Sequence, residues 1–492
     1  MPARTGKQYL DSLRDGREIW LNGEKVEDVT QHPAFKETAE AIAHLYDLQH
    51  EHADIMLMKS PDTGDPVNIT HKIPKSKNDL AHIQKAVKLW AESSAGIMGR
   101  SPDYLNITFA CFAAHAHVWA RRGNDRGAQN LINYQRQLRE NDWCLTHSII
   151  NPQVDRSVPE AEQGAGEVSL HKVGETEDAI IVRGARMLAT LAPFADELAV
   201  YPGSDIRIQD KKYAICFSIP MNTPGLKFIC RDSYTKNRNR FDYPFSSRFD
   251  EMDAVVIFDD VHVPKDRVFL DGDPIGYTEV IHDTHWRAYI IFQAMTRALT
   301  KLEFAFGLGH SIAEMTGVNR FDHVQEKLGE MWTMMEMTRS ALVSAIEGAF
   351  ANEEGTFIPD ERPLVALRGI MPKWIPRAFE LLRLVGGGGF MLTPSRADLD
   401  GPLRKYIDKY YQARNAPAEE RIRLFRMAWD FIGSDLASRG ELYERFYLSD
   451  SFRMTAMAYR LADKTHPVGL VNRFLDEEII EKNKSTTEVQ SR

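Results

Sequence analysis

Apolar residues recur at three- and four-residue intervals through most of the first 143 residues, a period that predicts amphipathic helices. We expect helices at residues 32–48, 77–95, 101–121 and 125–141. Near the start, residues 18–26 form a short extended run containing Asn22-Gly23, a turn signal typical of a β-hairpin. The first part of the chain is therefore predicted to be helical, with one small hairpin.

The pattern changes to short β-rich runs between about residue 144 and residue 273. The predicted strands are residues 179–183, 213–219, 226–230 and 254–258. Clusters of Gly, Pro, Asn and Asp, such as residues 221–225, separate them. Because no helical segments alternate with these runs, we expect a small antiparallel barrel or sandwich rather than βαβ units.

Long helical patterns return after about residue 276 and are sufficient for a four-helix bundle. They span residues 287–316, 323–350, 362–385 and 418–439. Pro372 and Pro376 are expected to kink or interrupt the third helix, because proline has no N–H to donate. Four glycines at 386–389 indicate a flexible break at its end, and close approach of the backbone to a cofactor is a second interpretation.

The chain is too long for one hydrophobic core. Its 492 residues exceed the usual limit of roughly 250–300, so we expect an α+β protein of several domains. The three patterns divide it into a helical domain at 1–143, a β domain at 144–276 and a helical bundle at 277–492. This order is similar to that of the acyl-CoA dehydrogenase-like flavoprotein fold, in which the middle domain is a β-barrel.

Charge and composition argue against several classes of protein. The formal net charge is −9 and no basic tract is interleaved with aromatic residues, so we expect no binding to nucleic acid or anionic membranes. The uncharged run 104–120 is too short to span a bilayer comfortably, and residues 1–18 lack the apolar core of a signal peptide. Four cysteines without a C-x-x-C pair form neither a disulfide framework nor a zinc site. We expect a cytoplasmic protein without a metal centre.

Residues 99–104, Gly-Arg-Ser-Pro-Asp-Tyr, predict a helix start with a positive, phenol-binding corner. Ser101 is a good N-cap, Pro102 suits the first helical position, and an acidic residue follows in the first turn. The N-terminus of a helix attracts anions, Arg100 adds a permanent charge, and Tyr104 follows one turn later. This corner would suit a small anionic oxygen such as a phenolate or a peroxide. The alternative is an arginine–carboxylate pair beside a packed tyrosine.

A second polar segment lies at the predicted junction between the helical and β regions. Residues 146–156, Thr-His-Ser-Ile-Ile-Asn-Pro-Gln-Val-Asp-Arg, are dense in hydrogen-bonding groups on a turn fixed by Pro152. Such a turn can satisfy the polar edge of a flavin ring, and His147 can exchange a hydrogen bond with a substrate hydroxyl. A polar hinge is the alternative. Thr190, at the end of the run 185–190, either brings a hydroxyl to the same region or is a plain strand residue.

Taken together, these segments resemble the oxygenase components of two-component, flavin-dependent phenol monooxygenases, best known through the 4-hydroxyphenylacetate 3-monooxygenase family. The resemblance runs nearly end to end and includes RTGKQYL (4–10), GEKVEDVT (23–30), MGRSPDY (98–104), HSIINPQVDR (147–156), YPFSSRFDE (243–251), WDFIGS (429–434) and ELYER (441–445). It implies a homotetramer that receives FADH2 by diffusion from a separate NAD(P)H:flavin reductase and reacts it with O2. A flavin C4a-hydroperoxide would then hydroxylate a 4-hydroxyphenylacetate-like phenol ortho to its hydroxyl.

The resemblance also implies roles for residues at matching positions. Arg100, Tyr104 and His147 match the residues around the phenol oxygen of the substrate and are the expected catalytic residues. Gly203 and Ser204 match the positions that contact the other end of the substrate. The matching flavin-contacting positions are His147, Ser148, Ile149, Gln153, Val154, Asp155, Arg156, Thr190, Ser449, Asp450, Ser451 and Phe452.

Elementary chemistry agrees with these roles. A phenol, with a reference pKa of about 10, is barely ionised at neutral pH, yet its ortho carbon is far more nucleophilic in the anion. A fixed cation and hydrogen-bond donors at the oxygen lower that pKa. We expect Arg100 to supply the charge and Tyr104 and His147 the hydrogen bonds, with His147 also a candidate base. The apolar helix at 104–120 and a loop around Gly203 are expected to exclude water.

The identity of the substrate stays open. The four glycines at 386–389 are more than we expect of typical hydroxyphenylacetate enzymes, and related oxygenases act on phenol, chlorophenols, aromatic amines or biosynthetic aryl groups. Arg207, Lys211 and Lys212 are candidates for contact with a substrate carboxylate, although such surface side chains are usually just solvated.

Three rival functions are disfavoured. A 4-hydroxybutyryl-CoA dehydratase shares this fold but needs cysteine ligands for an iron–sulfur cluster, and no cysteine lies within 100–104 or after Cys230. A reductase-type flavoprotein would carry a dinucleotide fingerprint, which is missing. An inactive scaffold would be expected to have lost Arg100, Tyr104 or His147.

Overall fold

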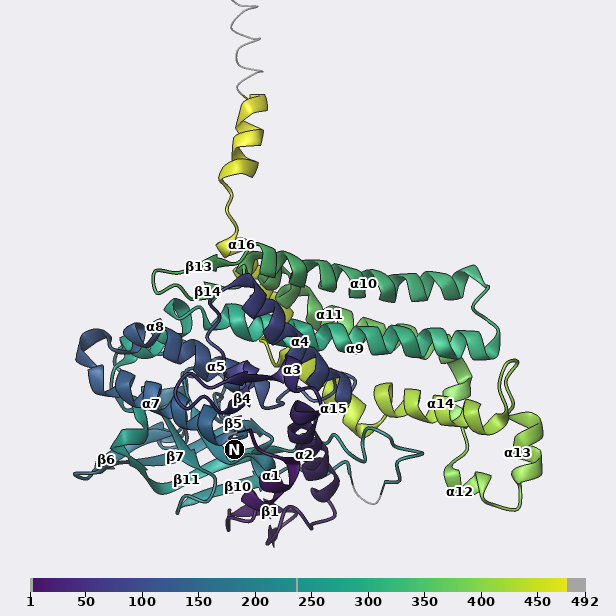
Figure 1. The fold of residues 1–492 in the computed structure, drawn as a ribbon, viewed down its shortest axis with the longest axis horizontal. Helices are drawn as coiled ribbons and strands as arrows, with labels where there is room; N and C mark the ends of the chain where they lie inside the picture. The colour runs from purple at the N-terminus through teal and green to yellow at the C-terminus, as the bar shows by residue number, and fades with distance from the viewer. Residues whose placement is uncertain (1–2, 236–237, 476–492) are drawn as a thin grey trace, which may run out of the picture.

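The computed structural model describes residues 3–235 and 238–475 of the chain (Figure 1). A helical N-terminal region, a β region and long C-terminal helices follow one another along the chain. Figure 1 shows the β-sheets at one end of the molecule and the long helices along the opposite side. The predicted α+β class and the order of its three parts are thus confirmed. The boundaries at 143/144 and 276/277 stay a prediction.

The helices of the N-terminal region bury apolar residues at helical spacing. They are α1 (Gly6–Ser12), α2 (Lys36–Glu51), α3 (Ala53–Met56), α4 (Lys77–Ser93), α5 (Asp103–Ala114), α6 (Ala116–Trp119) and α7 (Asp125–Asn141). In α7, Leu131, Tyr134 and Leu138 are fully buried and lie on one face. Between α3 and α4 the short strands β3 (Leu57–Lys59) and β4 (Pro66–Asn68) form a hairpin.

The helix predicted at 101–121 is divided at His115, so that part of the prediction is wrong. His115 has φ −115° and ψ 34°, which separates α5 from α6. Its backbone N–H still bonds the carbonyl oxygens of Cys111 and Phe112, each at 3.2 Å, and its ring Nδ1 lies 2.9 Å from the carbonyl oxygen of Cys111. At the other end, α5 begins at Asp103, one position later than the predicted start at Pro102.

The β region consists of two sheets that face each other. One sheet has the strand order β2-β1-β10-β11-β7-β6 and the other β12-β9-β8-β5. The rings of Phe217 and Phe258, from β9 and β11, meet edge to face with centres 6.1 Å apart, which joins the two sheets through their inner faces. The strands are β1 (Ile19–Leu21), β2 (Glu24–Val26), β5 (Leu145–His147), β6 (His171–Glu175), β7 (Ala179–Thr190), β8 (Glu197–Val200), β9 (Ile215–Pro220), β10 (Leu226–Cys230), β11 (Asp253–Pro264) and β12 (Val268–Asp271).

Two strand pairs depart from the predicted antiparallel arrangement. The N-terminal hairpin β1–β2 forms as expected, but β1 also pairs in parallel with β10, with Ile19 opposite Phe228. Strand β5 pairs in parallel with β8, with His147 opposite Ala199. Both parallel pairs join segments far apart in the sequence, a distance that local periodicity cannot detect.

Long helices make up the C-terminal region. They are α8 (Pro274–Asp283), α9 (Trp286–Thr316), α10 (Asp322–Glu347), α11 (Glu361–Gly386), α12 (Arg396–Leu399), α13 (Arg404–Tyr410), α14 (Ala418–Ile432), α15 (Asp435–Phe446) and α16 (Ser451–Leu461), with a β13–β14 hairpin (Phe350–Ala351 and Phe357–Ile358). Helices α9, α10 and α11 pack side by side, and α15 and α16 pack against α11 (Figure 1). Helices α4 and α5 lie against α9, which connects the bundle to the N-terminal region.

Two details of the bundle differ from prediction. Helix α11 continues through Pro372 and Pro376 and ends at the glycine run, so the expected interruption is wrong. The helix predicted at 418–439 is divided at Gly433, where a side chain would lie 2.6 Å from the ring of Trp429. Ser434 then caps α15 by accepting a hydrogen bond from the backbone N–H of Ala437 at 3.2 Å.

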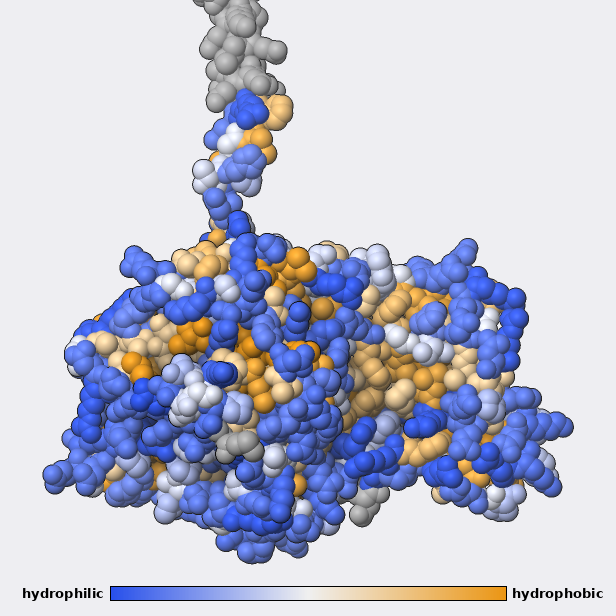
Figure 2. Space-filling model, viewed as in Figure 1, coloured by the Kyte–Doolittle hydropathy of each residue, from blue (hydrophilic) through white to orange (hydrophobic). Residues whose placement is uncertain are grey.

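The surface is mostly polar, with apolar side chains gathered over the long helices on the face shown in Figure 2. The exposed apolar residues of α10 include Trp332, Met337 and Val343. None of the helices within residues 3–235 and 238–475 is long and apolar enough to cross a bilayer.

Candidate active site

Three side chains singled out by the sequence lie together where the start of α5 meets the end of β5. The guanidinium Nε of Arg100 donates a hydrogen bond to Nε2 of His147 at 3.2 Å. The guanidinium carbon lies 4.1 Å from the ring centre of Tyr104, and the rings of Tyr104 and His147 meet edge to face, 5.5 Å apart. The structure thus brings a cation, a phenol and an imidazole into one cluster.

Local structure explains why these residues meet. Arg100 lies in the loop before α5 and Tyr104 in its first turn, so both are presented at the same end of the helix. His147 is the last residue of β5, and the parallel register with β8 fixes its position beside Ala199. A helix start and a strand end therefore converge on one point.

Burial controls the charge of this cluster. The exposed fractions are 7% for Arg100, 2% for Tyr104 and 4% for His147. Burial, and then the charge of Arg100, hold the pKa of His147 well below its ordinary value. Burial also raises the pKa of Tyr104, although Arg100 opposes the change. At neutral pH the cluster therefore contains a guanidinium cation, a neutral imidazole and a neutral phenol.

The guanidinium of Arg100 is not used in an ion pair within the described part of the chain, which counts against the arginine–carboxylate alternative. Glu251 lies nearby, but its carboxylate accepts from the backbone N–H of Arg100 at 2.6 Å. The side chain instead donates to His147, to the carbonyl of Gly99 and to the hydroxyl of Tyr443. The cation is thus held by neutral groups, an arrangement that leaves its charge available to an anionic ligand.

Two tyrosines that the sequence reasoning missed complete the cluster. The hydroxyl of Tyr443, on α15, accepts a hydrogen bond from Arg100 at 2.5 Å. Its ring stacks on that of Tyr447 with centres 4.6 Å apart, and both ring centres lie within 5.5 Å of the Arg100 guanidinium carbon. Tyr443 belongs to the ELYER segment that carries the family resemblance, but no local pattern connects it with Arg100.

Helix α15 is fixed to the rest of the molecule by ionic contacts on either side of Tyr443. The buried carboxylate of Glu444 receives two hydrogen bonds from Arg297, at 2.7 and 3.1 Å, and one from Lys301. Arg439 bonds Asp253 at 2.6 Å and Glu251 at 3.2 Å. These pairs tie α15 to α9 and to the segment that enters β11, so the tyrosines are held against Arg100.

The segment expected to contact a flavin runs along strand β7. Ser148 donates its backbone N–H to Ala199 at 3.1 Å and its hydroxyl to the carbonyl of Met187 at 3.1 Å. The carbonyl of Ile149 accepts from Arg186 at 3.1 Å. Beyond this ordered stretch, the predicted positions Gln153, Val154, Asp155 and Arg156 are exposed on a loop.

Thr190 lies behind this segment, at the end of β7. It is buried, its carbonyl accepts from Thr146 at 2.6 Å, and its hydroxyl donates to Asp253 at 2.7 Å. The threonine is thus part of the hydrogen-bond network beneath His147 rather than an exposed strand residue.

Gly203 and Ser204 lie on an exposed loop after β8. A Cβ on Gly203 would be 2.9 Å from the carbonyl oxygen of Ile149, so the loop approaches the predicted flavin segment closely and only glycine fits. Of the cations considered for a substrate carboxylate, Arg207 is occupied by Asp210 and Glu162, at 2.7 and 2.6 Å.

The predicted C-terminal segment 449–452 is docked on α11. Arg368 donates its Nε to the carbonyl of Leu448 at 2.8 Å, and Ser451 donates its hydroxyl to the carbonyl of Gly369 at 2.7 Å. Asp450 caps α16, Ser449 has a left-handed φ of 76°, and Phe452 is 83% exposed. Because Tyr447 contacts Arg100, this segment begins next to the candidate catalytic cluster.

The side chains of the predicted flavin-contacting segments, residues 147–156 and 449–452, fit a flat, partly apolar cofactor. Val154 and Phe452, both predicted flavin-contacting residues, are 62% and 83% exposed, and Leu188 of β7 is 52% exposed. The Nη1 atom of Arg368 is buried and makes no hydrogen bond. Exposed apolar side chains and an unsatisfied buried donor are typical of a surface that a ligand completes.

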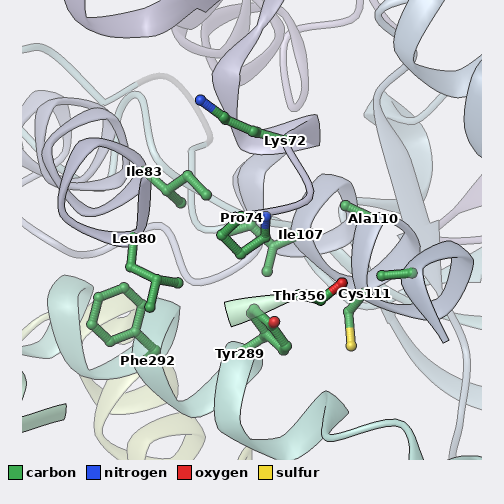
Figure 3. Close-up of a pocket in the computed structure, with 11 residues that line it drawn as sticks. Lys72, Pro74, Leu80, Ile83, Ile107, Ala110, Cys111, Tyr289, Phe292 and Thr356 are labelled. Carbon is green, nitrogen blue, oxygen red and sulfur yellow. The ribbon is translucent and has the colours of Figure 1, made fainter. Parts of the chain in front are cut away.

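Two cavities lie away from the cluster and involve none of its residues. One, beside α5, is lined by Ile107, Tyr289 and Phe292 among others (Figure 3). Its volume of about 10 Å³ is enough for about one water molecule and too small for an aromatic ring. The other, of about 420 Å³, lies beside Gly388 and Phe425.

Across the residues that the structure describes, no group of three or more metal-ligating side chains occurs.

Comparison with known proteins gives consistent matches over almost the whole chain. The N-terminal and C-terminal sequence profiles of 4-hydroxyphenylacetate 3-hydroxylase match residues 5–270 and 278–476. The 4-hydroxyphenylacetate 3-monooxygenase oxygenase component of Thermus thermophilus is 38% identical over 97% of this chain and 98% of its own. The oxygenase component of a Rhodococcus 4-nitrophenol 2-monooxygenase is 35% identical over 91% of this chain and 86% of its own.

Solved structures agree with the sequence matches. A crystal structure of a 4-hydroxyphenylacetate 3-monooxygenase oxygenase component complexed with FAD and 4-hydroxyphenylacetate has a TM-score of 0.92 and 38% identity, covering 97% of this chain and 99% of that one.

Proposed function

Because the chain belongs to the 4-hydroxyphenylacetate 3-hydroxylase family, we propose that it is the oxygenase component of a two-component, FADH2-dependent aromatic monooxygenase. Its substrate is a phenol related to 4-hydroxyphenylacetate, which it hydroxylates at the carbon ortho to the hydroxyl, with O2 as co-substrate. One observation carries the proposal: the guanidinium of Arg100, the ring of Tyr104 and Nε2 of His147 converge in a buried cluster.

The chain's own residues prepare the phenol. A phenol oxygen placed beside Arg100 faces a permanent charge in a site of low dielectric constant, which lowers the pKa of the phenol. The neutral imidazole of His147 can accept the phenol proton at Nε2, and Tyr104 can donate a hydrogen bond to the resulting anion. Reduced flavin supplies the activated oxygen when it is bound.

The residues that would hold the flavin surround this cluster. We assign its ring edge to His147, Ser148 and Ile149, with Thr190 beneath them, and its remaining contacts to the loop Gln153, Val154, Asp155 and Arg156 and to the C-terminal segment Ser449, Asp450, Ser451 and Phe452. The closeness of Gly203 to Ile149 supports placing the far end of the substrate against Gly203 and Ser204.

The proposed function also implies partners for this chain. The names of the relatives as oxygenase components imply a separate reductase. We propose that FADH2 reaches this chain by diffusion from that reductase, that the chain works as a homotetramer and that it is cytoplasmic. The substrate alternatives remain phenol, a chlorophenol, an aromatic amine or a biosynthetic aryl group, and the Rhodococcus relative supports a substrate range that includes substituted phenols.

A product screen tests the proposed function. The purified chain, any NADH:flavin reductase, FAD and O2 would be incubated with 4-hydroxyphenylacetate, phenol, tyrosine, 4-nitrophenol or anthranilate, and products identified by mass spectrometry. We expect a gain of one oxygen atom on at least one phenol, with the new hydroxyl ortho to the old one. Production of hydrogen peroxide alone with every substrate would count against a monooxygenase.

A further inference from the structure

We propose that Tyr201 is a positioning residue that holds His147 in the tautomer able to accept a proton from a bound phenol. The inference rests on the proposed function and adds to it a residue that neither the sequence pattern nor the family resemblance singled out. Tyr201 follows directly after β8, two residues beyond the position that pairs with His147 in the parallel register.

Buried hydrogen bonds join Arg100, His147 and Tyr201 in a row. Arg100 Nε lies 3.2 Å from Nε2 of His147, and Nδ1 of the same ring is hydrogen-bonded to the hydroxyl of Tyr201.

The bond from Arg100 fixes the tautomer of His147. A guanidinium can only donate, so Nε2 of His147 must carry a lone pair toward Arg100. The ring is then neutral with its proton on Nδ1, and Nδ1–H donates to the hydroxyl oxygen of Tyr201. In this tautomer the basic nitrogen faces the site, where a phenol hydroxyl can take the place of the Arg100 N–H.

Tyr201 acts through His147 and does not contact the substrate position. Its side chain is 1% exposed and its ring lies edge-on to Phe112 and Trp286, with centres 5.5 and 5.7 Å away. The charged and titratable groups facing His147 are Arg100, Tyr104 and Tyr201 itself. The surrounding rings hold the hydroxyl of Tyr201 in place, so the orientation of the imidazole is set before a ligand arrives.

The proton step is simple to write. The O–H bond of the phenol breaks, its electron pair stays on the phenol oxygen beside Arg100, and the proton bonds to Nε2 of His147. The imidazolium that results keeps its Nδ1–H bond to Tyr201, so no second proton has to move. Without the Tyr201 oxygen, the buried Nδ1–H has no acceptor, and the tautomer with the proton on Nε2 cannot accept from a phenol.

Binding of 4-nitrophenol to the flavin-free protein tests this role, because its absorbance distinguishes phenol from phenolate. In the wild type we expect bound 4-nitrophenol to ionise at a lower pH than the free compound. In Tyr201→Phe, which keeps the packed ring, we expect the pKa of bound 4-nitrophenol to rise by about one unit relative to wild type, the scale of one lost buried hydrogen bond.

Tyr9→Phe is the matched control, because it removes another buried tyrosine hydroxyl, bonded to the carbonyl of Phe194 at 2.8 Å. We expect it to leave the ionisation of bound 4-nitrophenol unchanged. If Tyr201→Phe and wild type ionise bound 4-nitrophenol at the same pH, the positioning role is wrong while the proposed function stands. If the wild type itself does not favour the phenolate, the proposed function has lost its main support.

Discussion

The guanidinium of Arg100 has three hydrogen-bonding neighbours, His147, Tyr443 and the carbonyl of Gly99, and all of them are neutral groups. This arrangement differs from an ordinary buried arginine, which is usually paired with a carboxylate. Its charge is therefore available to stabilise a developing phenolate, and removing it should affect chemistry more than cofactor binding.

Arg100→Ala should lower the hydroxylation rate by about 100-fold or more, the scale of losing one preorganised charge-stabilising donor, while the dissociation constant for reduced flavin changes little. Product formation under saturating FADH2 and O2 measures the hydroxylation rate, and anaerobic titration with FADH2 measures the dissociation constant. Arg121→Ala, which removes a partly exposed arginine paired with Glu279 and Asp283, is the control. Full activity in Arg100→Ala would remove Arg100 from the mechanism.

His71 gives a prediction about pH. It is fully buried, both ring nitrogens lack hydrogen-bond partners, and burial, then the charge of Arg139, lower its pKa to about 3. The unfolded chain binds a proton on this ring below about pH 6.5 whereas the folded chain does not, so acid favours unfolding. The free energy of unfolding should fall as the pH drops from about 6.5 toward about 3.

The measurement is urea denaturation at several pH values. His71→Leu, which cannot titrate, should flatten the dependence on pH in that window, whatever it does to stability at pH 7. His310→Asn, at an exposed position of α9, should leave the slope as it is in wild type. An equally steep slope in His71→Leu would show that other groups dominate acid unfolding.

At the scale of elements, the sequence predicted well those segments whose own periodicity decides their structure. The bounds of α7 and β10 agree with the predicted ranges, and α9 begins one residue early. Errors occur where the backbone leaves helical geometry inside a continuous apolar pattern, at His115 between α5 and α6 and at Gly433 between α14 and α15.

The candidate site, too, could be predicted only in part from the sequence. Arg100 and Tyr104 are one turn apart, so their meeting could be predicted from a helix start. The polar turn at 146–156 offered His147 as a partner for a substrate hydroxyl, and the resemblance was needed to join it to the other two. Tyr201, Tyr443 and Glu251 could not be found in this way, because they reach the cluster only through the parallel β5–β8 register and through ionic contacts made by α15. Long-range pairing leaves no periodic signal in either partner.

The buried ion cluster that holds α15 gives a prediction at this scale. Glu444→Gln would leave Arg297 and Lys301 without a counter-charge, which should lower the free energy of unfolding by about 3–5 kcal/mol. Urea denaturation near neutral pH measures this change in the free energy of unfolding. Glu441→Gln, three residues earlier and paired with the partly exposed Arg445 and Arg383, should cost at most about 1 kcal/mol. Equal effects of the two variants would contradict the structural role assigned to Glu444.

At the scale of the whole molecule, residues 465–475 form a helix that projects away from the body (Figure 1). Its apolar side chains recur at helical spacing and are exposed, with Val468 at 52%, Val471 at 59%, Phe474 at 66% and Leu475 at 54%. An isolated helix of this length is marginal in water, so its apolar face requires a partner. The proposed homotetramer would supply one.

Light scattering after size-exclusion chromatography tests this assembly. The wild type should have four times the 56.1 kDa mass of one chain. A double substitution of Val471 and Phe474 by Glu should reduce the mass at low micromolar concentration, because charges would replace the apolar contact. Asn472→Glu, on the polar side of the same helix, should leave it unchanged. A monomeric wild type would rule out the tetramer and the role of this helix together.

The pairing of β1 with β10 has a consequence for how the protein is made. Ile19 leaves the ribosome long before Phe228, its neighbour in the finished sheet. Until β10 is synthesised the N-terminal hairpin has no ladder to join, and until the hairpin docks, one side of β10 stays an open edge with unpaired backbone groups. A variant that lacks residues 1–26 should therefore keep most of its helices but expose the edge of β10. We expect this variant to precipitate rather than remain in solution.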